Sequence, residues 1–400
     1  MKMASLLALV TCAGLPLLAQ APVSLNIADV ATARLGFQGQ FQLQSNTDPV
    51  VQGTSSNFVI RRCRLLAGGT IGERFDWLFD VDAPNIGKIG SNIDGQKNLN
   101  NLYIQDAVLT TRFCPGFVLD TGILTVDPNH NGLTSSARYL GNDAAAYASL
   151  QNTPLGNSAT AALTGSSPFA REVGLSARGL VGQHLEYHFA VTNGYRNSGN
   201  DQAGVTGTAT PSPALPAATA GTTIAGNNAL RTTLRVQYDL FDNEGAGYSV
   251  AETYFGAKKI VSFGLGLDRQ DSYRQTTGDV FVDLPLKGGD VVTGTANYWL
   301  YDGGTFLPSL PRQKDWSLQA GYLFKATGLE PIVRVESRRM DTPVATALDE
   351  DRQCLGLAYW IHAQRANLKV FYNAVKPRNL AATSQSRYHQ VTAQFQLLAW

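Results

Sequence analysis

The chain has 400 residues, is 44% hydrophobic and carries a formal net charge of +1. A balance so close to zero excludes the basic footprint of a nucleic-acid-binding protein and a strong field over the whole surface. The cysteines are few and widely spaced, which excludes a disulfide framework, and no CxxC pair indicates a metal site. Any charge selectivity must therefore be local.

The N-terminus has the three parts of a secretory signal peptide. Lys2 precedes an apolar run at residues 6–18, and Ala19-Gln20-Ala21 is a small-x-small triplet of the kind that signal peptidases cleave. The run is too short to span a bilayer, which takes about twenty residues. We expect residues 1–21 to be removed and residues 22–400 to form the mature barrel, which offers no apolar stretch long enough for a helical anchor.

Strand-like alternation begins soon after this segment. In LGFQGQFQLQ, residues 35–44, an apolar residue or glycine stands at every odd position and glutamine at nearly every even one. Period-two alternation places the two kinds of side chain on opposite faces of a strand. The same pattern recurs at residues 73–82, 184–192 and 230–240, where Asp, Glu, His and Arg stand on the polar face. Each of these strands is therefore predicted to have one apolar face and one polar face.

Seventeen candidate strands follow one another, near residues 34–45, 58–69, 73–82, 101–113, 117–126, 171–179, 184–193, 229–240, 247–256, 259–269, 276–284, 290–301, 315–325, 330–340, 352–361, 367–375 and 386–400. A sandwich would hold roughly ten strands or fewer. Closing the strands into one cylinder removes every edge, puts the aromatic-rich faces in lipid and turns the polar faces to water. We therefore predict an all-β, transmembrane antiparallel barrel. Because single-chain bacterial barrels have even strand numbers, we expect sixteen or eighteen strands, which makes one assignment wrong.

The connections also fit a barrel with short periplasmic turns and long extracellular loops. Residues 114–116 and 287–290 are tight, whereas residues 127–170 and 195–228 are long. The second long segment consists mainly of Gly, Ala, Thr, Ser and Pro, which predicts a mobile external loop. Both chain ends are expected on the periplasmic side.

Several ordered blocks are similar to the phosphate-selective porin O and P family. They include YDLFDNEGAGYSVAETYFGAKKIVSFGLGLD at 238–268, DVFVDLPLKGGDVVTGTANYWLYDGG at 279–304, FVIRRCRLLAGG at 58–69 and LEPIVRVESRR at 329–339. The resemblance implies a channel of roughly sixteen strands, usually trimeric, whose third loop folds into the lumen and narrows it. In phosphate-binding members, lysines and arginines at this constriction and on the neighbouring wall carry the anion.

The equivalent loop here, residues 127–170, is poor in cations. It has one arginine before its end, Arg138, one histidine, His130, and no lysine, and Thr125 stands where many members have lysine. Desolvating phosphate is costly unless several fixed donors replace its water. We therefore expect at most a modest anion preference, with a phosphate-selective channel as the alternative.

Arginines and carboxylates recur on the predicted inner faces. The candidates for attracting anions are Arg62, Arg64, Arg112, Arg138, Arg231, Arg235, Arg334 and Arg338. The acidic pore-lining candidates are Asp76, Asp80, Asp82, Asp106, Glu186, Asp239 and Glu336. Fixed guanidinium groups grip anions, yet the same groups paired with these carboxylates would form a mixed-charge wall that only keeps the pore wet. In a regular strand Arg61 would point outward if Arg62 points into the lumen. We therefore expect that Arg61 lies near a rim, that its side chain snorkels towards the membrane interface, or that it marks a β-bulge.

The sequence thus predicts an outer-membrane porin for passive diffusion of small hydrophilic solutes or ions, as a homotrimer in outer-membrane lipid. No cofactor, metal or nucleic-acid partner is predicted. His184, Glu186 and His188 share one strand face, which is typical of a lumen-lining row. No GxSxG or HExxH motif is present. Two further classes stay open, a non-conducting structural or adhesive barrel and an outer-membrane enzyme that would use His389 with Ser384 or Ser386.

Overall fold

The computed structural model describes residues 23–27, 30–47, 53–87, 102–148, 171–194, 229–306, 310–341, 349–378 and 387–400. The predicted signal peptide and the predicted external loop at 195–228 lie outside these residues, as do residues 149–170 of the predicted constriction loop. No helix in the described ranges is long and apolar enough to cross a membrane.

The described chain is built from strands with one short helix. The elements are β1 (Val23–Ile27), β2 (Ala31–Thr47), β3 (Thr54–Ile71), β4 (Phe75–Asp82), β5 (Tyr103–Cys114), β6 (Phe117–Thr125), α1 (His130–Leu133), β7 (Arg171–Val181), β8 (Leu185–Thr192), β9 (Arg231–Asp239), β10 (Ile260–Gln270), β11 (Tyr273–Pro285), β12 (Val291–Asp302), β13 (Gln313–Leu323), β14 (Leu329–Met340), β15 (Glu350–His362), β16 (Ala366–Pro377) and β17 (Tyr388–Ala399).

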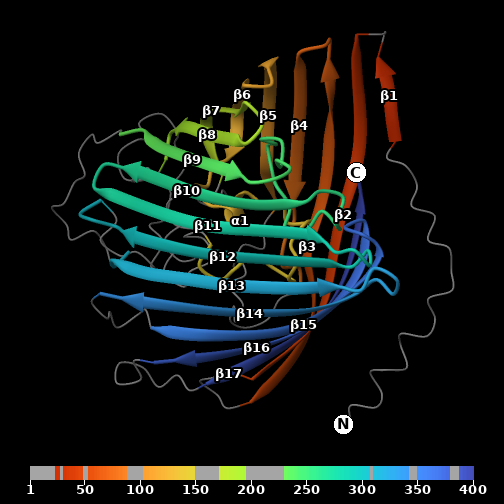
Figure 1. Ribbon diagram of the computed structural model, residues 1–400, viewed down its shortest axis with the longest axis vertical. Helices are drawn as coiled ribbons and strands as arrows, with labels where there is room; N and C mark the ends of the chain where they lie inside the picture. The colour runs from red at the N-terminus through yellow and green to blue at the C-terminus, as the bar shows by residue number, and fades with distance from the viewer. Residues whose placement is uncertain are drawn as a thin grey trace.

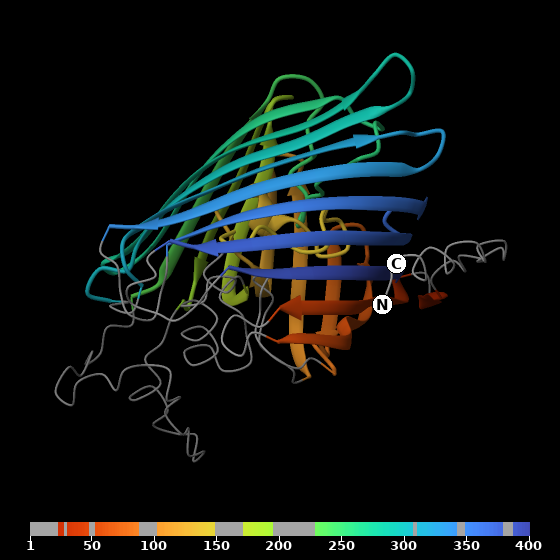
Figure 2. The same cartoon turned by 90° about the horizontal axis from the view of Figure 1, so that it is seen from below.

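Sixteen of these strands, β2 to β17, close into an antiparallel barrel. Each pairs with the next, and β17 returns to β2 with Gln396 opposite Gln40. Figure 2 shows this junction, where the dark blue last strand lies beside the orange-red first strands. In Figure 1 β3 to β6 run across the direction of β10 to β14, as expected for tilted strands. The predicted fold is confirmed, and closure leaves no barrel strand with an unpaired edge.

Side chains alternate between an exposed apolar outer face and a buried polar inner face. Leu265 on β10 is 71% exposed. The glutamines at 38, 40, 42 and 44 are each at most 2% exposed and line the inner face of β2. There the amide of Gln42 donates to Gln394 at 2.7 Å, and that of Gln40 donates to Gln396 at 2.6 Å. The apolar face of the first predicted strand points outward, as expected for contact with lipid.

One predicted strand is wrong and one strand was not predicted. Residues 247–256 are not a barrel strand but part of the connection 240–259 between β9 and β10. Their sequence resembles that of a strand because Val250, Glu252 and Tyr254 alternate with small residues. This segment lies inside the barrel between a loop and the wall, which also gives it two different faces. The unpredicted strand, β1, pairs with the start of β2, Val23 opposite Leu35.

The connections fall on two rims. The turn rim carries the short connections at 72–74, 115–116 and 286–290, and β6 and β8 end at the opposite rim, which we call the loop rim. Two connections depart from the predicted rule. Residues 271–272 form a tight turn on the loop rim, and residues 240–259 form a long connection on the turn rim. The long connection at 240–259 folds into the lumen of the barrel.

Replacing Leu265 by Arg should impair barrel assembly. Leu265 is exposed at the middle of β10, where a charge facing the bilayer midplane costs about 2 to 4 kcal/mol. Assembly into vesicles can be followed by the shift in gel mobility between folded and boiled protein. Leu265→Phe is the matched control and should assemble normally; equal loss in both variants would contradict the outward assignment.

Candidate functional site

Two connections fold into the barrel and meet there. We call residues 126–148, which enter from the loop rim and contain α1, the loop insert, and residues 240–259, which enter from the turn rim, the turn insert. Figures 1 and 2 show α1 and the chain around it within the barrel. The inserts share backbone hydrogen bonds: the N–H of Ser135 donates to Val250 O at 3.1 Å, and that of Glu252 to Arg138 O at 3.1 Å. The lumen is therefore crossed by one continuous structure.

The loop insert begins with a tightly capped turn of helix. Asn129 is the N-cap of α1, and its side chain accepts the N–H of Asn131 at 2.9 Å. At the other end the Thr134 hydroxyl donates to His130 O at 2.9 Å. The Asn129 amide also donates to Thr277 on β11 at 2.7 Å. These contacts fix a very short helix against the wall.

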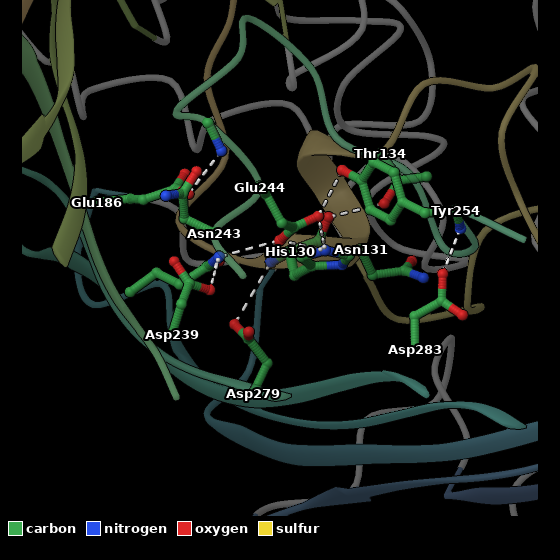
Figure 3. Close-up of polar contacts among 12 residues, drawn as sticks. His130, Asn131, Thr134, Glu186, Asp239, Asn243, Glu244, Tyr254, Asp279 and Asp283 are labelled. Atoms are coloured by element: carbon green, nitrogen blue, oxygen red, sulfur yellow. Dashed lines mark hydrogen bonds and ion pairs between the residues drawn. The ribbon is translucent and has the colours of Figure 1, made fainter. Parts of the chain in front are cut away.

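A buried ion pair joins the two inserts. The His130 Nε2 lies 3.0 Å from Glu244 Oε2, and the Tyr254 hydroxyl donates to Glu244 at 2.8 Å. Figure 3 shows His130 and Tyr254 converging on Glu244. Burial alone would lower the pKa of His130, but the neighbouring carboxylate outweighs it and raises that pKa. Burial alone would raise the pKa of Glu244, but His130 and further hydrogen bonds lower it.

Glu252 makes a second junction between the inserts. Its carboxylate accepts the backbone N–H of Leu140 at 2.7 Å and the side-chain amide of Asn131. It also accepts the amide of Gln319 from β13 at 3.1 Å. One carboxylate on the turn insert therefore holds two points of the loop insert and one point of the wall.

Two of the predicted acidic candidates anchor the turn insert to the wall. Glu186 on β8 accepts the N–H groups of Gly245 and Ala246 at 2.7 and 2.6 Å (Figure 3). Asp106 on β5 accepts the Tyr248 hydroxyl at 2.7 Å. Asp106 also pairs with Arg171 on β7 at 3.4 Å, an arginine that was not among the candidates considered from the sequence.

Arg61 and Arg62 both point into the lumen. Gln40 is opposite Arg62 and Phe41 is opposite Ile60, so Arg61 is the extra residue of a β-bulge. Of the three explanations for its phase, the structure shows the bulge. Both guanidinium groups reach Asp143 of the loop insert, with N–O distances of 2.7 and 2.9 Å. Burial alone would raise the pKa of Asp143, but the two arginines hold it well below its usual range.

Other wall cations hold the backbone of the loop insert. The Lys369 ammonium on β16 donates to Tyr139 O at 2.6 Å and to Gly141 O at 2.8 Å. Arg334 on β14 donates to Asp143 O at 3.0 Å. Carbonyl groups at alternate positions of the insert are thus each bound by a fixed cation.

The remaining predicted wall arginines are deeply buried and paired. Arg64 lies 3.3 Å from Asp80 and 2.9 Å from Asp82. Four further pairs are Arg231 with Asp268 at 2.6 Å, Arg235 with Asp279 at 2.5 Å, Arg334 with Glu336 at 3.3 Å and Arg338 with Glu350 at 3.9 Å. These five arginines are therefore neutralised by carboxylates of the wall.

Four predicted residues lie in other settings. Arg112 and Asp76 pair at 3.1 Å near the turn rim, where their side chains are 47% and 32% exposed, so they do not belong to the buried wall. Asp239 accepts the amide of Gln237 at 3.0 Å. Arg138 is half-buried beside the turn insert, and its guanidinium has no ion pair within the described ranges.

Several residues that hold the inserts or the wall arginines could not be identified from sequence. The residues not singled out are Asp143, Glu244, Glu252, Asp268, Asp279, Glu350 and Lys369. No local pattern distinguishes these residues, and their partners lie on other strands or inserts. The one available signal was the out-of-phase Arg61.

Other kinds of site find no support in the described part of the chain. No group of His, Cys, Asp and Glu there has the geometry of a metal site. His184 contacts Asp239 O at 2.8 Å, whereas its predicted row-mate Glu186 binds the turn insert. His389 contacts the Tyr372 hydroxyl at 2.6 Å, and Ser384 and Ser386 lie outside the described residues.

No protein-family model matches the chain, and no curated protein matches it. Several solved structures, however, are similar to the chain. OprB of Pseudomonas putida has a TM-score of 0.60 at 8% identity, over 92% of this chain and 94% of that one. The anion-selective porin from Comamonas acidovorans has a TM-score of 0.53 at 11% identity, over 92% and 99%. The outer membrane channel DcaP of Acinetobacter baumannii has 0.53 at 12%, over 94% and 100%. The chain has the fold of these barrels, whereas the phosphate-selective family rests on the sequence resemblance alone.

The His130–Glu244 pair should stabilise the folded barrel most between pH 4.5 and 6.5, the ordinary pKa values of the two groups. The contribution of His130, whose pKa is raised, is complete below its ordinary pKa and is lost as the pH rises through its folded pKa. The contribution of Glu244, whose pKa is lowered, is complete above its ordinary pKa and is lost as the pH falls.

A double-mutant cycle of His130→Gln and Glu244→Gln, measured by denaturant unfolding, checks this pH dependence. The coupling free energy should be about 1.5 to 3 kcal/mol near pH 5.5 and smaller near pH 10. A coupling that is the same at both pH values would show that the pair is not ionic.

Proposed function

We propose that the chain is an outer-membrane porin that passes small hydrophilic solutes or ions by passive diffusion, with at most a modest anion preference. The observation that carries the proposal is the closed barrel with an apolar outer face and an inner wall whose arginines are paired with carboxylates, crossed by two inserts. Such a wall keeps water and ions in the lumen while the inserts set its width.

The pairing pattern supports the weak selectivity. A guanidinium group that already binds a carboxylate offers a passing anion little net charge, and a buried ion pair is costly to break. Arg138 is the exception in the loop insert, and one cation biases passage without replacing the water around a phosphate ion. A phosphate-selective channel, the alternative suggested by the sequence resemblance, would need several such groups.

A second candidate function is a non-conducting structural or adhesive barrel. The observation that favours it is the junction between the inserts, because a loop held from both rims leaves less room than a loop held from one. Under either function we infer a homotrimer in outer-membrane lipid, removal of residues 1–21 by signal peptidase, and both chain ends on the periplasmic side.

Single-channel recording in a planar bilayer separates the two functions. The purified protein should give conductance steps of stable size and a reversal potential that indicates a slight excess of anion over cation flux. Added phosphate at about millimolar concentration should change chloride conductance little, because the wall arginines are paired. Absence of steps from correctly folded protein would favour the plugged barrel, and block by micromolar phosphate would favour the phosphate-selective channel.

Shortening the turn insert should widen the pore. Replacing residues 244–254 with a short Gly-rich turn removes the contacts of Glu244 and Glu252 with the loop insert, so single-channel conductance should rise. The matched control is a Gly-rich replacement of residues 286–290, an exposed turn on the same rim, which should leave conductance unchanged. Equal conductance of both variants and wild type would show that the turn insert does not limit the pore.

A further inference from the structure

Two arginines stand side by side on the outer face of the barrel, next to the loop rim. Arg269 near the end of β10 and Arg274 near the start of β11 are directly opposite each other in the strand register. Both are exposed, whereas their neighbours Gln270 and Tyr273 are buried on the inner face. The two strands lie side by side and are joined by the tight turn at 271–272 (Figure 1). Like charges in directly opposite positions destabilise a sheet unless another group compensates them.

The described part of the chain supplies no ion pair to either arginine. The Arg269 Nε donates to the backbone carbonyl of Asp271 at 3.4 Å, a long hydrogen bond. Asp302 on β12 is opposite Arg274, but its Oδ1 accepts the N–H of Gly304 at 3.0 Å. The pair therefore presents two uncompensated guanidinium groups to the surroundings of the barrel.

A second cation pair at the same rim is compensated. Lys314 on β13 is opposite Arg339 on β14, and both lie on the outer face. Lys314 is 3.6 Å from Asp341, and Arg339 is 2.5 Å from Asp351. The chain thus provides carboxylates where two outward cations meet on β13 and β14. The pair on β10 and β11 needs its anion from outside the described chain.

The arginine pair lies at the depth where lipid headgroups begin. Leu265 is the outward residue at the middle of β10, and Arg269 is about 13 Å nearer to the loop rim along the strand. A strand tilt of about 40° makes this about 10 Å along the membrane normal. The apolar band of such a barrel is about 25 Å tall, so it extends about 12 Å from its middle. A long arginine side chain at this level places its guanidinium group among the headgroups.

Below the pair, the outer face of β11 carries small side chains. Its outward residues towards the turn rim are Thr276, Gly278, Val280 and Val282. Gly278 lies between Leu265 on β10 and Tyr298 on β12. A Cβ at Gly278 would have its nearest neighbour, Leu265 Cδ2, at 3.7 Å. A track without a side chain of its own therefore runs between two large apolar residues.

The track leads into a hollow of about 300 Å³ on the outer face. Val280, Val282, Gly294, Ala296 and Ala320 are among the residues that line it. Small residues allow another chain to approach the backbone closely within a membrane. The hollow and the track together provide a continuous apolar path that begins beneath the two arginines.

We propose that this face binds one anionic, phosphate-bearing lipid, with its phosphate between Arg269 and Arg274 and an acyl chain along β11 into the hollow. Two guanidinium groups offer several N–H donors in a geometry that matches phosphate oxygens, and the phosphate removes the repulsion between them. Anionic headgroups also attract cations at the membrane surface. The site lies outside the lumen, so a barrel that does not conduct would still bind the lipid.

Lipid titration tests the site directly. The full barrel, purified in detergent, is titrated with lipid A or with phosphatidylcholine and examined by native mass spectrometry. Lipid A, an acylated disaccharide with anionic phosphates, should bind about tenfold tighter than the zwitterionic phosphatidylcholine. Arg269→Gln combined with Arg274→Gln should weaken lipid A binding about tenfold and leave phosphatidylcholine binding unchanged. Equal lipid A affinity of the folded variant and wild type would overturn the proposal.

Arg312→Gln combined with Lys314→Gln is the matched control. It removes the same number of positive charges from the same rim and face. Both of these cations already have Asp341 as a partner, at 3.3 and 3.6 Å. This variant should bind lipid A as wild type does. A loss equal to that of the first variant would overturn the proposal, because it would reflect overall charge alone.

Two further measurements separate the headgroup from the acyl chain. Gly278→Leu fills the track without changing a charge, so lipid A should bind about threefold more weakly or less tightly still. Unchanged affinity would overturn the path along β11. Inorganic phosphate at the concentration of the lipid should not displace lipid A, because it has no acyl chain. Displacement would show a site for free anions and would overturn the assignment to a lipid.

A single variant and the oligomeric state complete the test. If the double glutamine variant does not assemble, Arg274→Gln alone should still weaken lipid A binding, and unchanged affinity would overturn the site. The double variant should keep the oligomeric state of wild type. A change of oligomeric state with unchanged lipid A affinity would show that this face meets a second copy of the chain, which would also overturn the proposal.

Discussion

Charges inside the barrel need partners, because a buried ion without one costs several kcal/mol or more, about as much as the net stability of many domains. The inner wall contains many such ions, and the strands do not satisfy all of them. Glu186 and Asp106 take donors from the turn insert, and Arg61 and Arg62 take an acceptor from the loop insert. The two inserts therefore follow paths that bring their own donors and acceptors into contact with these buried wall ions. The interior of the barrel is therefore as specified as the core of a soluble protein.

The same pairing explains how a wall rich in arginine accompanies weak proposed selectivity. Charge sets ion preference only where it is left uncompensated, and here carboxylates from neighbouring strands or from the inserts lie against the wall guanidinium groups. The family resemblance concerns the strands and their order, whereas selectivity depends on what the loop contributes. This loop contributes Asp143, whose carboxylate pairs with Arg61 and Arg62 on the wall.

Period-two alternation was enough to predict the barrel, because lipid and lumen impose opposite demands on successive residues. It failed at residues 247–256, where Val250 faces the loop insert and alternation reflects a two-sided environment without strand pairing in the wall. Arg61 was visible as a break in phase, but its role was not, since Asp143 is distant in the chain. His130 and Glu244 are likewise brought together only by the paths of two irregular segments. Local patterns fix which face a residue takes; the partners follow from tertiary contacts that no local pattern encodes.

The central claim is that two inserts from opposite rims are joined inside the lumen as one fixed constriction. A disulfide between them tests it most directly, with Thr134→Cys and Val250→Cys introduced after Cys63, Cys114 and Cys354 have been replaced. Thr134 and Val250 are paired as a parallel β-bridge, so their backbones are close enough for a disulfide with small adjustment. The cross-link should form in the folded barrel and leave single-channel conductance unchanged. Failure of oxidised, correctly folded protein to form it, or a large change in conductance when it forms, would contradict a fixed junction.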